Sequence, residues 1–368
     1  MEILTSRKAV AAIVIALFAV LVAVIVFSGN SNKKEEEKVV VSLVLTGAAD
    51  DGGWNQSHYE ALKLLEEEMN LRLICRENVP ETDDSIVAVI DELAQEGVSV
   101  ICAAGWGYGK SILSVNEKYP DIMFLHCAGT EESGNVSCFF GRMYQARYLT
   151  GIAAAMKSES KQLGYVAAMK TDEVIRGINA FTLGARSVDP EITVHVAWTD
   201  SWENEELEKQ LAGQLIEEYG CDVLTYHQNT ASVCEAADSR GVSCIGYHHE
   251  NEARFPDTYL TTAEWHWAEF YRRRIQECIQ GSVSGKNYWD GINEGAVGIS
   301  PLTENNAEGT AAAIDATLKR FSDGDWDVFF GPVYDSEGNL RVAEGESMTD
   351  EQMLNGFDWL VMGAESIN

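Results

Sequence analysis

Residues 39–75 read VVVSLVLTGAADDGGWNQSHYEALKLLEEEMNLRLIC, and this stretch decides the fold class. An apolar run at 39–45 is typical of a buried strand. Residues 57–70 repeat apolar side chains on one helical face, and a second apolar run follows at 71–75. A strand, a helix and a second strand in close succession predict a parallel sheet with a right-handed crossover.

The same alternation continues along the chain and then starts again. Two successive units of this kind predict an α/β protein of two doubly wound lobes, with ligand loops at the carboxyl ends of the strands. Further strands are expected at 98–103, 122–127, 164–168, 193–198, 222–226, 242–247 and 259–262. Further helices are expected at 83–96, 111–118, 174–186, 205–219 and 231–240.

The domain boundaries follow from these patterns. We expect an anchor and tether at 1–38, lobe one at 39–160 with part of the C-terminal region returning to it, and lobe two at 161–290. Residues 291–368 should supply a crossover helix, a hairpin and a last helix. The hairpin should pair 328–333 with 339–342, and Thr349 is the expected N-cap of a helix at 349–354.

The N-terminus carries an apolar run at 9–27 preceded by Arg7 and Lys8. Nineteen helical residues span roughly 28 Å, close to the thickness of a hydrocarbon core. The run is longer than that of most cleaved signal peptides, so an uncleaved membrane segment is favoured, with a cleaved signal as the alternative. The basic side should stay in the cytoplasm, and residues 28–38 should form a solvated tether outside the cell.

Composition excludes some functions. The formal net charge is −31, from 58 acidic and 27 basic residues, which disfavours nucleic-acid binding. None of the eight cysteines forms a Cys-x-x-Cys pair, so a structural zinc site is poorly supported. These cysteines could be small buried apolar side chains, or some of them could form disulfides outside the cell, and the sequence does not decide between the two.

Polar and aromatic residues recur where the predicted strands end. An aromatic face with hydrogen-bonding neighbours suits a planar ligand. The loops concerned are 50–56, 105–109, 170–176, 227–230, 248–251 and 264–267.

Several catalytic or metal readings are weaker. Residues 109–111 resemble the end of a phosphate loop, but the required earlier glycine is replaced by Ala104. The histidines of the later loops could approach Glu250, yet none has the spacing of a zinc protease. No Gly-x-Ser-x-Gly motif is present, and nothing fixes the separation of Asp50 and Glu173 for acid–base work.

Specific stretches resemble a known family. They are Asp51-Gly52-Gly53-Trp54-Asn55, Glu-Asn-Val-Pro at 77–80, EVIRGINAFTLGAR at 173–186, Tyr247-His248 and Trp265-His266-Trp267. From residue 39 to the C-terminus the chain resembles the basic membrane protein family of substrate-binding proteins, which includes purine nucleoside receptors of ABC uptake systems. It is most similar to the branch associated with purine bases such as adenine.

This resemblance implies a type I periplasmic-binding fold, with a multi-strand hinge and a ligand trapped by closure. It implies a monomeric binding protein without enzyme activity, metal or cofactor, which delivers its ligand to a membrane permease. The lysine that contacts ribose in nucleoside receptors has no counterpart that we can place here, which favours a base. The expected ligand-binding residues are Trp54, Asn55, Trp106, Tyr108, Glu173, Arg176, His227, Asn229, His248 and Trp265.

Two other functions compete with this one. A hydrolase that cleaves nucleosides through carboxylates would turn its ligand over, whereas a receptor returns it intact. A sensor would pass occupancy through the membrane segment, but residues 1–8 are a short cytoplasmic end for signalling.

Overall fold

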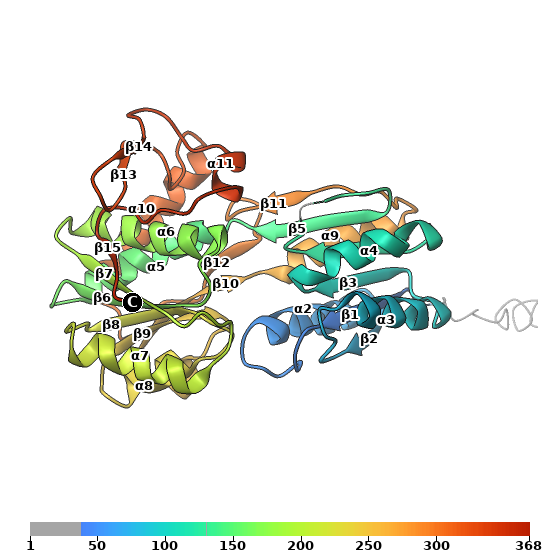
Figure 1. The fold of residues 1–368 in the computed structure, drawn as a ribbon, viewed down its shortest axis with the longest axis horizontal. Coiled ribbons are helices and arrows are strands. Elements are labelled where there is room, and N and C mark those ends of the chain that lie inside the picture. The colour runs from blue at the N-terminus through green and yellow to red at the C-terminus, as the bar shows by residue number, and fades with distance from the viewer. Residues whose placement is uncertain (1–37, 130) are drawn as a thin grey trace, which may run out of the picture. The chain divides into compact units, whose positions relative to one another are not determined.

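The chain builds two mainly parallel sheets with helices on both faces of each (Figure 1). The computed structural model describes residues 38–129 and 131–368, so the predicted membrane segment and tether lie outside the described residues apart from Lys38. No helix within the described ranges is long and apolar enough to span a bilayer. The doubly wound α/β class predicted from the strand–helix alternation is confirmed.

The first sheet has the strand order β11-β5-β4-β3-β1-β2, and all its pairs are parallel. Helices α2 and α9 pack on one face, and α3 and α4 on the other. The strands are β1 (Val40–Leu45), β2 (Arg72–Arg76), β3 (Val100–Ala104), β4 (Met123–Cys127), β5 (Val136–Gly141) and β11 (Tyr288–Asp290). The helices are α2 (Trp54–Glu68), α3 (Asp83–Gln95), α4 (Gly109–Val115) and α9 (Trp267–Ile279).

The second sheet has the order β12-β10-β9-β8-β6-β7-β15, with only β12 antiparallel to its neighbour among these described strands. Helices α7 and α8 cover one face, and α5, α6 and α10 the other. The strands are β6 (Gln162–Ala167), β7 (Thr193–Trp198), β8 (Val223–His227), β9 (Ser243–His248), β10 (Tyr259–Trp265), β12 (Val297–Ile299) and β15 (Ala364–Ser366). The helices are α5 (Met143–Lys157), α6 (Asp172–Val188), α7 (Glu205–Glu217), α8 (Ser232–Asp238) and α10 (Thr310–Asp323).

The chain passes between the two sheets at three places. It leaves the first sheet between β5 and α5, returns between β10 and α9, and leaves again between β11 and β12. These three crossings match the multi-strand hinge that the family resemblance implies. Residues 39–368 form one compact unit, and the expected division at 160 and 290 stays a prediction.

Local hydrogen bonds explain where the structure departs from the expected helix starts. Helix α2 begins at Trp54 and not at residue 57, because the Asp51 carboxylate accepts from the backbone N–H groups of Gly53, Asn55 and Gln56. Helix α6 likewise begins at Asp172, where the Thr171 hydroxyl caps the Val174 N–H at 3.4 Å. Trp54 and Glu173 therefore stand on first helical turns rather than on loops.

The C-terminal hairpin forms, but its first strand is shorter than expected. β13 (Val333–Tyr334) pairs with β14 (Leu340–Val342), whereas residues 328–332 contain no strand. Val328 and Phe329 are buried in the core beside α5 and α6, which explains their apolar character without a strand. The capping box at Thr349 confirms the predicted start of α11 (Asp350–Leu354).

Helices α5 and α6 approach each other closely. A Cβ atom added at Gly151 would lie 2.1 Å from the Phe181 carbonyl oxygen, and one at Gly184 would lie 2.0 Å from that of Tyr148. Only glycine permits this backbone contact.

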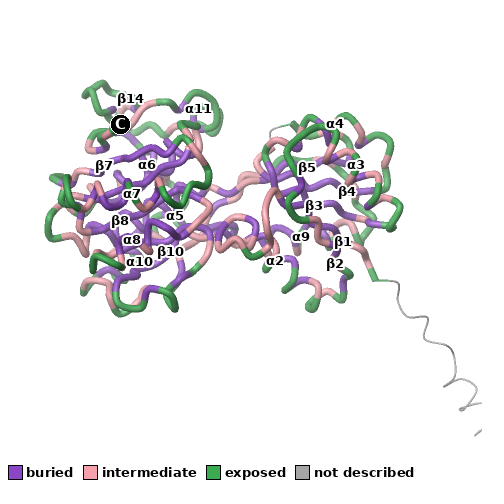
Figure 2. Tube along the Cα trace, turned by 60° about the horizontal axis from the view of Figure 1, so that its bottom comes forward, coloured by how far each residue is buried: buried purple, intermediate pink, exposed green. Residues whose placement is uncertain are grey.

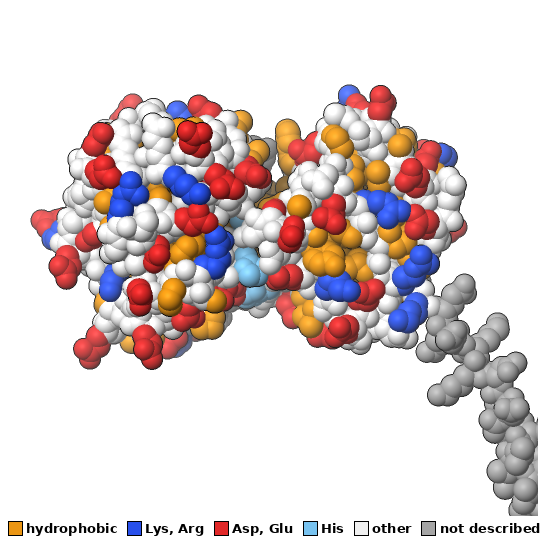
Figure 3. Space-filling model, turned by 90° about the horizontal axis from the view of Figure 1, so that it is seen from below, with side chains coloured by type: hydrophobic (Ala, Val, Ile, Leu, Met, Phe, Trp, Pro, Cys, Tyr) orange, Lys and Arg blue, Asp and Glu red, His pale blue; other side chains and the backbone are white. Residues whose placement is uncertain are grey.

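Burial separates interior from surface clearly. The central strands are buried almost throughout (Figure 2). All eight cysteines are free, and six of them are buried, as expected of small interior side chains. Acidic side chains are spread over the face drawn in Figure 3, with fewer basic ones between them.

Candidate functional site

Trp54 is the centre of an aromatic cluster drawn from both sheets. Its indole Nε1–H donates to the Ala104 carbonyl oxygen at 2.9 Å, which fixes the ring at the carboxyl end of β3. Ring centroids of His248 and Trp265, from the second sheet, lie 5.8 and 6.0 Å away. Phe140, at the end of β5, lies at 6.4 Å. The structure thus brings together three residues predicted for the site: Trp54, His248 and Trp265.

A stack of three parallel rings supports this cluster. Trp265 stacks on Trp267 at 4.5 Å, and Trp267 stacks on His58 at 4.5 Å. His58 also hydrogen-bonds through Nδ1 to the Tyr271 hydroxyl at 2.7 Å. Burial lowers the pKa of His58 to about 3, so this ring is neutral. Sequence reasoning missed His58, Phe140 and, as a site residue, Trp267, although Trp267 was quoted in the family motif.

His248 is held at the edge of the cluster in a fixed tautomer. Its backbone has φ +68°, and its Nδ1 accepts from the Trp265 indole N–H at 3.0 Å. Burial is the main reason that the pKa of His248 is lowered well below its usual value, and the nearby His227 and Arg147 add to the shift. The ring packs against Tyr247, with centroids 3.6 Å apart.

Polar groups of the second sheet meet beside these rings. Glu173 Oε1 lies 3.5 Å from His227 Nε2, and the same nitrogen is 3.2 Å from the Tyr247 hydroxyl. His227 is buried, whereas the Glu173 side chain is 28% exposed and can meet a ligand. After the dominant effect of burial, the Glu173 charge further raises the pKa of the Cys127 thiol at the end of β4. Glu173 therefore lies at the carboxyl end of the second sheet, within electrostatic range of the first.

Backbone contacts hold the loops of the two sheets together. A Cβ atom added at Gly53 would lie 2.0 Å from the carbonyl oxygen of Asn229, so only glycine fits this approach. His249 Nε2 and Glu60 Oε2 are 3.1 Å apart across the same junction. These contacts describe a closed arrangement of the residues around Trp54.

Four predicted residues have other neighbours. The Asn55 amide donates to Asp51 Oδ2 at 2.8 Å and accepts from Thr46, so it organises its own loop. Trp106 is 75% exposed, and its ring has no aromatic or hydrogen-bonding partner among the residues that the structure describes.

Tyr108 and Arg176 point into packed interiors. The Tyr108 hydroxyl donates to the Val79 carbonyl oxygen at 2.6 Å within the core under α3 and α4. Arg176 is buried, donates to the Met353 carbonyl oxygen and lies 5.2 Å from the Trp289 ring. The structure thus gives both side chains contacts outside the cluster around Trp54.

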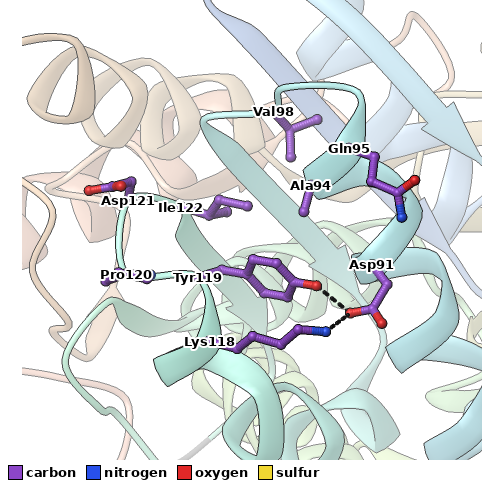
Figure 4. A pocket seen from close by; sticks show the side chains of 9 residues that line it. All are labelled: Asp91, Ala94, Gln95, Val98, Lys118, Tyr119, Pro120, Asp121 and Ile122. Carbon is purple, nitrogen blue, oxygen red and sulfur yellow. Dashed lines mark hydrogen bonds and ion pairs between the residues drawn. The ribbon is translucent and has the colours of Figure 1, made fainter.

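A separate surface pocket lies between α3 and the segment 118–122 that precedes β4 (Figure 4). Its volume is about 380 Å³. Asp91 accepts from Lys118 at 3.0 Å and from the Tyr119 hydroxyl, and Figure 4 shows these groups turned toward one another. Because these polar groups satisfy each other, the pocket is a weaker candidate than the aromatic cluster.

The described residues contain no group of three or more His, Cys, Asp or Glu side chains suited to hold a metal ion. Among the histidines considered for such a site, His249 pairs with Glu60 and His266 with Glu264 at 3.0 Å. The arrangement around Trp54 can instead stack on a flat molecule and accept hydrogen bonds from its edge.

Comparison with known proteins places this geometry in a family. The purine-binding protein of Brucella abortus (strain 2308) is 32% identical over 321 residues, which are 87% of this chain and 91% of that protein. A putative ABC transporter glucose-binding protein of Haloferax volcanii is 32% identical over 290 residues, 78% of this chain and 73% of that protein.

A solved ABC transporter solute-binding protein from Conexibacter woesei has the same fold. Its TM-score is 0.69 at 19% identity, and the match covers 78% of this chain and 98% of that one. The family model described as ABC transporter substrate-binding protein PnrA-like matches residues 38–324. The predicted periplasmic-binding fold and family resemblance are thereby confirmed, and this chain belongs to the PnrA-like family of ABC transporter substrate-binding proteins.

Proposed function

We propose that this chain captures a purine base or nucleoside on the outer side of the membrane and hands it to an ABC permease. The observation that carries the proposal is the cluster of Trp54, His248 and Trp265, contributed by both sheets, together with the partly exposed carboxylate that Glu173 holds near His227. Aromatic faces together with polar groups at the edge are what a flat heterocycle needs to be held in one orientation.

Binding would proceed by opening and closing at the three chain crossings. Opening separates Trp54 from His248 and frees the Trp54 face for the ligand, and closure then brings the second sheet's loops over it. Glu173 and the Asn229 side chain would read the edge of the base. Asn55 is already bonded within its loop, so its part in ligand recognition would be to shape that loop.

The remaining expectations form part of the same proposal. Residues 39–160 and 161–290 would act as the two lobes, with an apolar segment at 9–27 holding the protein to the membrane. The protein would act as a monomer. It would release its ligand unchanged, because capture and delivery of a ligand involve no chemical step.

Replacing Trp54 with alanine tests the proposal. Removing the stacking face should weaken purine binding by about 1–3 kcal/mol. The measurement is calorimetry on the full chain with adenine, guanine, adenosine and glucose, and mass spectrometry should recover the ligand intact. Trp106→Ala tests the other predicted aromatic, and because its ring is 75% exposed it should weaken binding less than Trp54→Ala does.

Unchanged purine affinity in Trp54→Ala would overturn the proposed slot. Binding of glucose without any purine would overturn the proposed ligand class. A loss of affinity in Trp106→Ala equal to that in Trp54→Ala would instead place the ligand at the loop after β3.

A further inference from the structure

Arg147 on α5 carries a buried charge without a carboxylate partner. Its side chain is fully buried, and no ion pair joins it to any other residue within the described ranges. Nη1 reaches Thr225 Oγ1 at 3.5 Å, whereas Nε and Nη2 have no hydrogen-bond partner in this part of the chain. The guanidinium lies 3.8 Å from the centroid of the Tyr247 ring. A buried charge without an ionic partner costs folding free energy, which suggests that Arg147 has a function among the groups around it.

Three polar side chains converge at Gly177 of α6. A Cβ atom added there would lie 3.5 Å from the Tyr165 hydroxyl, 3.7 Å from His227 Nδ1 and 3.8 Å from Arg147 Cγ. The Tyr165 hydroxyl and His227 Nδ1 are buried and, like Arg147 Nε, have no partner among the described residues. We call Arg147, Tyr165, His227 and Tyr247 the Arg147 cluster.

His227 connects this cluster to the candidate site. Its Nδ1 faces the space beside Gly177, and its Nε2 faces Glu173 at 3.5 Å and the Tyr247 hydroxyl at 3.2 Å. A line of contacts thus runs from the buried guanidinium, through the Tyr247 ring and the His227 imidazole, to the partly exposed carboxylate of Glu173.

The charges around His227 oppose each other. Burial lowers the pKa of His227 most, Glu173 raises it, and Arg147 on α5 and Arg176 on α6 lower it again. The other titratable groups that face the ring are the phenols of Tyr165 on β6 and Tyr247 on β9, and the neutral His248. The two cations therefore offset the tendency of Glu173 to make His227 an imidazolium.

We propose that Arg147 is a positioning residue for ligand binding: its buried guanidinium, packed on the Tyr247 ring beside His227, disfavours a second positive charge on the His227 ring, so that the Glu173 carboxylate stays free to accept a hydrogen bond from an N–H group of the ligand. This inference rests on the function proposed above. It narrows the ligand to a heterocycle that presents an amino or ring N–H donor, and it disfavours anionic ligands.

The test uses the full chain and the variants Arg147→Met and Arg147→Lys. NMR of the ligand-free protein should show the pKa of His227 below its ordinary value in the wild type and in Arg147→Lys, and a higher pKa of His227 in Arg147→Met. Once protonated, His227 pairs with Glu173 and competes with the ligand. Adenine affinity should therefore change little between pH 8 and pH 6 in the wild type, and should weaken by up to about tenfold at pH 6 in Arg147→Met.

Arg320→Met provides a matched control. Arg320 stacks on Trp326 at 3.8 Å, the same distance as Arg147 on Tyr247, but belongs to α10 and does not touch His227. Its variant should keep the flat pH profile of the wild type. Should Arg147→Met fail to fold, Arg147→Gln and the wild-type NMR titration serve instead.

The outcomes separate this inference from the proposed function. Wild-type His227 that titrates near its ordinary pKa, or a flat affinity profile in Arg147→Met, would overturn the role of Arg147 while purine binding stood. A shift of His227 in the ligand-free variant without purine binding at any pH would support the charge arrangement and overturn the proposed ligand.

Discussion

His58 links a single side chain to the acid stability of the protein. Its pKa is about 3 because the ring is fully buried, whereas in the unfolded chain it returns to about 6.5. Below pH 6.5 His58 therefore binds a proton in the unfolded state but not in the folded state. The free energy of unfolding falls as the pH drops toward 3. At pH 5 this should cost about 2 kcal/mol relative to pH 7.

His58→Gln should remove that contribution and flatten the fall in unfolding free energy between pH 7 and pH 5. Denaturant titrations at each pH measure the free energy of unfolding. The quantity to compare between variants is the slope of this free energy with pH, not its absolute value. Identical slopes in His58→Gln and the wild type would contradict the burial of an uncharged ring.

Residue types at strand ends predicted part of the site but not the direction of each side chain. His248 and Trp265 meet because they end β9 and β10, two neighbouring parallel strands of one sheet, and Trp54 approaches them from the other sheet. Tyr108 turns into the core, since the backbone after β3 places its hydroxyl on the Val79 carbonyl. Arg147 was not predicted as a site residue, because its local sequence contains no pattern that indicates a buried cation.

At the scale of elements, the contact between α5 and α6 depends on two glycines. Gly184→Ala should destabilise the protein by about 1–3 kcal/mol or more, because a methyl group would press on the Tyr148 carbonyl and force two backbones apart. Chemical unfolding monitored by circular dichroism measures this loss.

Gly213→Ala in α7 is the matched substitution. There the new methyl group meets the flexible end of Arg240 at 2.9 Å, and alanine favours the helix, so stability should hold or rise. Equal destabilisation of both variants would show that backbone contact between α5 and α6 is not the cause.

Helix α5 itself was not predicted, and its environment explains why. Nearly all of its residues, from Met143 to Ala155, are buried because α6, α10 and the second sheet surround it. Without a polar face it lacks the amphipathic repeat by which α3 and α7 were found. The strands β11, β12 and β15, of three residues each, are too short for any periodic signal.

For the whole molecule, the charge of −31 should make stability depend on salt. Excess acidic charge on the folded surface repels itself, and added salt screens this repulsion. The thermal midpoint at pH 7.5 should rise by a few degrees between 20 mM and 500 mM KCl. At pH 5, where carboxylates begin to take up protons, the same salt step should have a smaller effect. A midpoint that falls with salt at pH 7.5 would show that ion pairs outweigh the net repulsion.

The three chain crossings also impose an order on biosynthesis. A ribosome that has released residues 39–260 has delivered β1–β5 and β6–β9, yet α9 and β11, which complete the first sheet, are still to come. One face of that sheet, lined by Leu43 and Phe139, must then wait for Phe270 and Tyr271 before it is covered. The first sheet, whose strands emerge first, is thus completed late. The apolar face that α9 will cover has to stay shielded in the nascent chain until residue 290 has emerged.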